Sequence, residues 1–74
     1  MNIIEALEAL KCGFSVVAYS EYETMATELF KLVSPDTVEL YYPESERPVD
    51  VMSMAKFQET YTNVEFTVYN IKTT

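Results

Sequence analysis

The fold of this chain is decided near its start, where residues 2–19 read NIIEALEALKCGFSVVAY. Asn2 is followed three positions later by Glu5, the pattern of a capping box that begins a helix. Gly13, the only glycine of the chain, stands where the end of a helix favours a left-handed residue. We therefore predict a helix over residues 3–12. The apolar residues that recur at helical spacing are Ile3, Ala6, Leu7 and Leu10.

Working outward, residues 14–19 are rich in β-branched and aromatic side chains, which predicts a strand. Ser20 and Glu23 have the spacing of a second capping box. Pro35 excludes the helical conformation for the residue before it, so this second helix is expected over about residues 21–33. Its apolar stripe comprises Tyr22, Met25, Ala26, Leu29 and Val33, widened by Phe30 and Leu32.

Residues 37–42 alternate in polarity and predict a half-buried strand. The residues expected to point inward are Val38, Leu40 and Tyr42. The stretch 49–62 fits two structures. Either Asp50 or Ser53 caps a short helix with Met54, Phe57 and Tyr61 on one face, or 49–54 returns as a hairpin strand. The good helix formers in 54–59 favour the helix.

Residues 64–71 again alternate and predict a last strand. The resulting order is αβαβ(α)β. With so few elements, the economical packing is a three- or four-stranded sheet whose helices cover one face. We predict one compact α+β domain over residues 1–74.

The composition combines an apolar interior with a strongly acidic surface. Apolar residues make up 49% of the chain, whereas twelve acidic and five basic residues give a net charge of −7 at pH 7. Such a chain does not bind nucleic acid or an anionic membrane directly. A domain this short buries only about 60% of its unfolded surface, so a partner or a second copy would stabilise it.

The same inventory argues against catalysis. There is no histidine to act as a base for a serine or cysteine nucleophile, and one glycine cannot build a phosphate-binding loop. One cysteine without histidine cannot form a structural zinc site. We therefore expect no enzymatic activity, cofactor or metal. Cys12 has no disulfide partner in the chain, which favours the cytoplasm, and we expect its thiol to pack in the core.

The candidate binding residues are carboxylates with one tyrosine. Glu21 and Glu23 lie at the expected start of the second helix, and Glu44, Glu46 and Asp50 surround a proline-bounded loop. Glu39 and Glu65 lie on predicted strands that could be neighbours. Tyr41 is added because tyrosine beside carboxylate is typical of interfaces with basic partners. If these residues served structure alone, they would complement a helix terminus or remain solvated.

Charge density limits how far the acidity can imitate nucleic acid. A monomer of this size exposes roughly 4,700 Å², about one acid per 400 Å². B-DNA carries one charge per about 110 Å² if it is taken as a cylinder roughly 20 Å wide. Imitation of DNA therefore requires the acids to be concentrated on one face. Dimerisation would double the number of acids brought together in this way. The partner expected from this hypothesis is a basic host protein that handles nucleic acid.

Two other functions remain open, a sponge for a small nucleotide signal and a structural or assembly subunit. Residues 1–17 resemble the start of many small phage-encoded proteins, including the phage anti-Thoeris sponge family, which sequesters a cyclic nucleotide. Where that family usually has arginine and tryptophan, this chain continues with Ala18-Tyr19-Ser20, and no binding residue carries over. The resemblance implies a phage or mobile-element inhibitor, of the anti-CRISPR or anti-restriction type, acting in the host cytoplasm.

Overall fold

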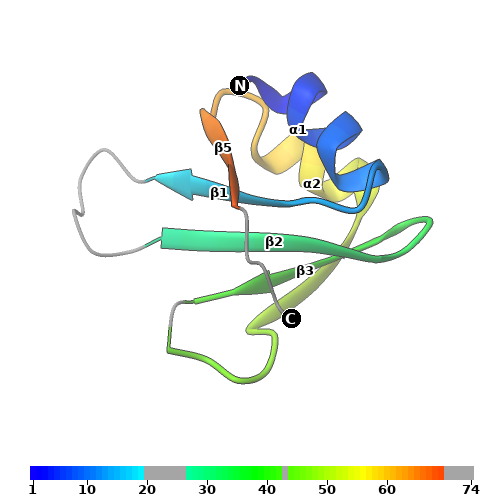
Figure 1. The fold of residues 1–74 in the computed structure, drawn as a ribbon. Coiled ribbons are helices and arrows are strands. Elements are labelled where there is room, and N and C mark those ends of the chain that lie inside the picture. Colours follow the sequence, from blue (N-terminus) through cyan, green and yellow to red (C-terminus); the bar gives the residue numbers. More distant parts are fainter. Residues whose placement is uncertain (20–26, 43, 70–74) are drawn as a thin grey trace.

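The protein is a five-stranded antiparallel sheet with two helices on one side (Figure 1). A computed structural model describes residues 1–19, 27–42 and 44–69. The elements are α1 (Ile3–Lys11), β1 (Ser15–Tyr19), β2 (Thr27–Ser34), β3 (Thr37–Tyr41), β4 (Asp50–Ser53), α2 (Met54–Thr60) and β5 (Phe66–Tyr69). The α+β class is confirmed, but the sheet has five strands rather than three or four.

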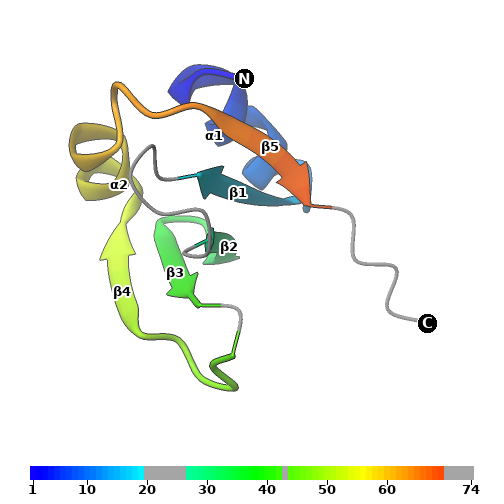
Figure 2. The ribbon, with the colours of Figure 1, turned by 90° about the vertical axis from the view of Figure 1, so that its left-hand side faces the viewer.

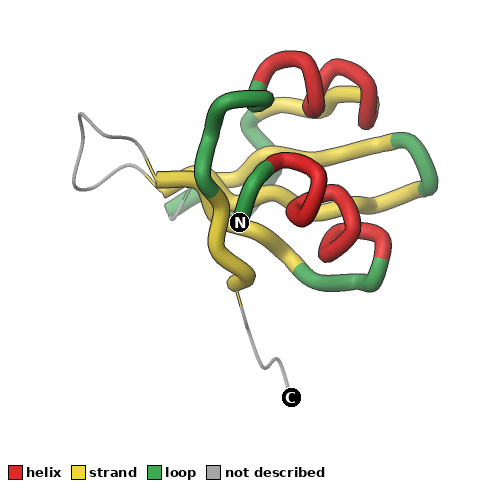
Figure 3. The backbone as a smooth tube through the Cα atoms, turned by 90° about the horizontal axis from the view of Figure 1, so that it is seen from above, coloured by secondary structure: helices red, strands yellow, loops and turns green. Residues whose placement is uncertain are grey.

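The strands lie in the order β4-β3-β2-β1-β5, and each pairs antiparallel with its neighbours. Figure 2 shows how strongly the sheet twists, because β4 and β5 at its two edges run in clearly different directions. Seen from above, both helices lie over the strands on the same side (Figure 3). In the described part of the chain, neither helix lies on the opposite face. We call that face the open face. It carries Val17, Lys31, Glu39, Tyr41, Val51 and Tyr69.

Helix α1 has the termini that its sequence predicts. The Asn2 side chain accepts a hydrogen bond from the Glu5 amide at 2.9 Å, and the Glu5 carboxylate accepts one from the Asn2 amide at 3.1 Å. At the other end, Gly13 has φ 92°, its amide donates to the Leu10 carbonyl, and the Phe14 amide donates to the Ala9 carbonyl. These two bonds form a Schellman motif, which terminates the helix and leads directly into β1.

The prediction that Cys12 packs in the core is wrong, because its side chain is exposed. The buried stripe of α1 ends at Leu10. At about 100° per residue, a side chain two positions later points to the opposite side of the helix axis.

The helix predicted over 21–33 is also wrong where the structure describes it, since residues 27–34 form β2. Residues 20–26 lie outside the described part. As the middle strand, β2 pairs with β1 and β3, and its apolar residues Leu29 and Phe30 fall on opposite faces of the sheet. Leu29, Phe30, Leu32 and Val33 are also spaced as on one face of a helix, so apolar spacing alone does not distinguish the two structures.

Residues 49–62 contain both of the structures that the sequence allowed, one after the other. Strand β4 pairs with β3, and α2 begins immediately after it. The Ser53 side chain caps α2 by accepting from the Lys56 amide at 3.1 Å. Tyr42 was predicted to point inward, but it lies beyond the end of β3 and is 47% exposed. The last strand spans residues 66–69 of the predicted 64–71, of which 70 and 71 are not described.

The core is centred on Phe30, which is fully buried in the middle strand. Its ring centroid lies 4.8 Å from those of Phe57 and Tyr61 and 6.0 Å from that of Phe66. These partners come from α2, its C-cap and β5. Aliphatic side chains of α1 complete the same cluster: Ile3, Ala6, Leu7 and Leu10. One aromatic ring thus contacts residues from distant parts of the chain.

The substitution Phe30→Ala should lower the free energy of unfolding by about 3–5 kcal/mol, since it leaves a cavity in the core. A domain of this size has roughly 4–11 kcal/mol of total stability, so the variant should be close to unfolding. Urea titration followed by circular dichroism measures the change. The matched control Phe14→Ala removes a ring that is 49% exposed and should change stability by less than about 1 kcal/mol. Equal losses in both variants would contradict the assignment of the core.

The substitution Gly13→Ala should destabilise the protein by about 1–2 kcal/mol, because an L-residue is strained at positive φ. A Cβ placed at Gly13 meets no atom within 4 Å, so the loss is backbone strain rather than collision. Gly13→Asn should cost less, since asparagine tolerates this conformation better than alanine. Equal stability of the alanine variant and the wild type in thermal unfolding would contradict the Schellman motif.

Candidate functional site

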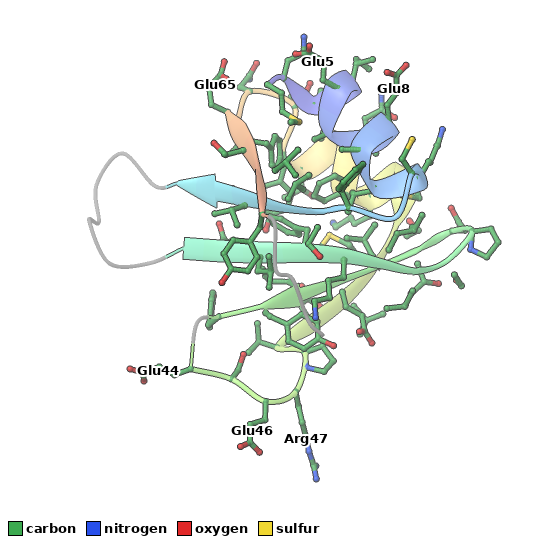
Figure 4. The ribbon with its side chains drawn as sticks, viewed as in Figure 1. Glu5, Glu8, Glu44, Glu46, Arg47 and Glu65 are labelled. Carbon is green, nitrogen blue, oxygen red and sulfur yellow. The ribbon has the colours of Figure 1, made fainter. Side chains whose placement is uncertain are left out.

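The eight candidate residues from the sequence do not form a single patch. Glu21 and Glu23 fall outside the described residues. The other six lie in three places: Glu65 near the amino terminus, Glu39 and Tyr41 on the open face, and Glu44, Glu46 and Asp50 in and beside the β3–β4 loop. Figure 4 shows Glu65 with Glu5 and Glu8 at one end of the molecule, and Glu44 and Glu46 at the opposite end.

The expectation that Glu39 and Glu65 lie on neighbouring strands is wrong. Strands β3 and β5 are separated by β2 and β1, and Glu65 precedes β5. The Glu65 carboxylate lies 3.4 Å from the amino group of Met1, which also donates to the Phe66 carbonyl at 2.7 Å. Since the Glu65 side chain is 87% exposed, this ion pair contributes little stability. Glu65 therefore belongs to the amino-terminal end of the molecule.

Tyr41 interacts with both Glu39 and Lys31. The Tyr41 hydroxyl donates to Oε1 of Glu39 at 2.7 Å, and Lys31 Nζ lies 5.0 Å from the centroid of the Tyr41 ring. The hydrogen bond to Glu39 is the main reason that the pKa of Tyr41 is raised, followed by burial and the negative charge of Glu39. The Glu39 carboxylate is thus engaged by Tyr41 on the open face, away from the other candidate acids.

The β3–β4 loop is anchored by Ser45. Its amide and its hydroxyl both donate to the Tyr42 carbonyl, at 3.0 Å and 2.9 Å, and Oγ accepts from the Tyr42 amide at 2.9 Å. The flanking side chains of Glu44 and Glu46 are exposed and extend away from the body of the molecule, with Arg47 beside Glu46 (Figure 4). The loop therefore presents its carboxylates to solvent on a fixed turn.

A second group of polar residues adjoins this loop. The Tyr61 hydroxyl lies 3.4 Å from Oε2 of Glu28, to which it donates a long hydrogen bond. Burial first, and then the negative charge of Glu28 and this hydrogen bond, raise the pKa of Tyr61 to about 12. Tyr42 and Asp50, at the two ends of the loop, lie close enough to raise it further. Tyr61 therefore stays protonated and remains a hydrogen-bond donor at neutral pH.

These residues define what we call the loop end: Glu28, Tyr42, Glu44, Glu46, Asp50 and Tyr61. Sequence reasoning included three of them and missed Glu28, Tyr42 and Tyr61 as binding residues. A strand over 27–34 would have placed Glu28 on the same face as Phe30, and the short helix would have brought Tyr61 to that face. Both signals were present in the sequence, but the helical interpretation of 21–33 concealed the first.

No carboxylate of the loop end forms an ion pair with a cation among the described residues. The ion pair found among the described residues joins Met1 and Glu65, and it involves no carboxylate of the loop end. Within the same residues, no three side chains of metal-binding types come close enough to hold an ion together. What the loop end offers is exposed negative charge, a tyrosine ring that is 47% exposed at position 42, and the Tyr61 hydroxyl.

Comparison of the chain with family models, curated proteins and solved structures finds no match. No helix within the described residues is both long enough and apolar enough to cross a membrane.

The raised pKa of Tyr61 predicts a loss of stability at high pH. The folded state holds the Tyr61 proton more tightly than the unfolded state, whose tyrosine ionises near pH 10.0. The resulting stability is complete below pH 10 and is lost as the pH rises towards about 12. The free energy of unfolding of the wild type should therefore fall relative to that of Tyr61→Phe over this range in urea titrations. A difference that is independent of pH would contradict the assignment.

Proposed function

We propose that this protein is a non-enzymatic binding module that engages a basic partner protein through the loop end. The observation that carries the proposal is the exposed group of Tyr42, Glu44, Glu46 and Asp50, whose charges have no cationic partner among the described residues. Tyrosine and carboxylate together suit arginine, because a guanidinium stacks on an aromatic ring while it donates to a carboxylate.

The partner we propose is a host protein that handles nucleic acid, since such proteins display lysine and arginine on their binding surfaces. The whole surface of 5391 Å² divided by twelve acids gives about 450 Å² per acid. B-DNA has one charge per about 110 Å². The surface charge density of the protein is thus about fourfold lower than that of DNA, too low for the protein to imitate an extended DNA duplex. It would block a local basic site, as an inhibitor of the type encoded by phages and mobile elements does.

Charge reversal of the loop tests the proposal. The variant Glu44→Lys/Glu46→Lys should bind the partner at least about 10-fold more weakly, because attraction becomes repulsion at the interface. The matched control is Glu8→Lys/Glu65→Lys, which reverses two acids at the opposite end (Figure 4). Both variants have the same net charge, since −7 + 4 = −3. Equal binding by the two variants would show that net charge, rather than the loop end, attracts the partner.

The partner itself can be identified by affinity capture from a host lysate with the wild type and both variants as baits. We expect nucleic-acid-handling proteins that the wild type and the Glu8→Lys/Glu65→Lys control retain and the loop variant loses. Their affinity should fall as salt rises from about 50 mM to about 500 mM, since screening weakens contacts between opposite charges. Affinity that is independent of salt would contradict a charge-based interface.

A further inference from the structure

The open face of the sheet combines apolar side chains with an unusual balance of charge. Cross-strand partners place Val17 beside Leu29 and Tyr41 in one row, and Val51 beside Glu39 in the next. Val17 is 3% exposed, whereas Val51 is 53% and Tyr69 45% exposed. Val17 is therefore already covered within the monomer, and the accessible apolar surface of this face lies towards its edges, at Val51 and Tyr69.

The open face differs from the rest of the molecule in its net charge. Ten of the twelve acids lie among the described residues, because Glu21 and Glu23 do not. Of these ten, Glu39 is the one that a strand places on the open face. Lys31 is its Cα partner on the neighbouring strand, so the charges that the described strands place on this face sum to zero. A surface without net charge inside a protein of net −7 is the region where a second copy is repelled least.

The Lys31–Glu39 pair also makes the face complementary to itself. The two residues lie directly opposite each other on β2 and β3. In a face-to-face pair of sheets, a two-fold axis that runs in the interface between β2 and β3 carries each residue to the position of the other. Lys31 of each copy then lies opposite Glu39 of the other copy, which gives the two equivalent contacts that a two-fold interface requires. Aligned packing of two twisted sheets is a common arrangement for such faces.

The edges of the sheet are less suited to self-association. The Met54 amide donates to the Asp36 carbonyl, so alternation along β4 directs the Val51 amide away from β3. This outward amide donates to the carboxylate of Asp50 at 2.8 Å, which places a negative charge on the edge. On β5, Phe66 exchanges two hydrogen bonds with Met1, donating at 2.8 Å and accepting at 2.7 Å. Both edges are thus partly blocked, and the face remains.

We propose that the open face is the interface of a two-fold symmetric dimer of this chain, in which Lys31 of each copy lies opposite Glu39 of the other. Five strands of about five residues cover roughly 400 Å² in projection. A standard interface buries about 800 Å² per partner, so the dimer is weak and depends on concentration. Each copy carries −7, and the repulsion between copies is screened by salt. The dimer therefore strengthens as salt rises, opposite to binding of a basic partner.

The first experiment is sedimentation equilibrium of the wild type over about 1 μM to about 1 mM, at about 50 mM and about 500 mM salt. We expect a monomer–dimer equilibrium that shifts towards the dimer at the higher salt. A monomer under all these conditions overturns the proposal, and so does a dimer that weakens as salt rises.

The second experiment uses two single charge reversals and their mixture. Lys31→Glu gives a copy with two acidic residues at the pair, and Glu39→Lys gives a copy with two basic ones. Each alone should dimerise at least about 10-fold more weakly than the wild type, because like charges face each other. Mixed in equal amounts, they should form a heterodimer about as tight as the wild-type dimer. Within each monomer the Lys31–Glu39 pair stays disrupted in the mixture. Recovery of dimerisation therefore reports contact between the two copies rather than restored folding.

Two controls separate position from net charge. Lys56→Glu and Glu59→Lys change exposed residues of α2 and alter the net charge to the same −9 and −5 as the two face variants. They should dimerise within about threefold of the wild type, and their mixture should show no preference for the heterodimer. A mixture of the face variants that stays monomeric, or α2 variants that lose the dimer equally, overturns the proposal.

The outcome is independent of the proposed function. The loop variant Glu44→Lys/Glu46→Lys should lose the basic partner and keep the dimer. Lys31→Glu should lose the dimer, and its loop end remains unchanged for binding the partner. If the open face instead binds a different protein, the wild type alone stays monomeric in the sedimentation experiment and the dimer is ruled out.

Discussion

Packing around Phe30 is the constraint on which the rest of this structure depends. Its ring, fully buried in the middle strand, contacts Phe57 and Tyr61 from the α2 region and Phe66 from β5. These contacts join segments that are more than 25 residues from Phe30 in the sequence, and they place Tyr61 where its hydroxyl reaches Glu28. The aromatic core and the loop end are therefore parts of one arrangement, because the same tyrosine packs its ring inside and directs its hydroxyl to the acidic group.

The two faces of the sheet have separate physical roles. The face under the helices supplies the hydrophobic free energy of folding, with Val16, Val38 and Phe30 fully buried there. On the opposite face, the described strands place one lysine and one glutamate beside apolar side chains such as Val17 and Val51. Figure 4 shows Glu5, Glu8 and Glu65 at one end of the molecule and Glu44 and Glu46 at the other, away from this face. The acidic loop end and the open face are thus two separate surfaces of one small protein.

Sequence reasoning succeeded where a pattern was local and failed where one pattern fitted two structures. The capping box of α1 and the alternation of β3 depend on residues within a few positions, and both are present. The run 27–34 fits a helix as well as a strand, and only pairing with β1 and β3 decides between them. The single acidic patch failed for a related reason, since the distance between Glu39 and Glu65 depends on strand order, which local sequence does not contain.

The amino-acid sequence by itself determined the net charge, the residue types available for chemistry, the α+β class and the position of the first helix and strand. These properties follow from composition or from hydrogen bonds between near neighbours in the chain. Tertiary structure decided that 49–62 contains both a strand and a helix, that Cys12 is exposed, and that Glu28 joins Tyr61 at the loop end. The physical reason is that strand pairing and core packing are non-local: each contact depends on where the whole chain places its partner.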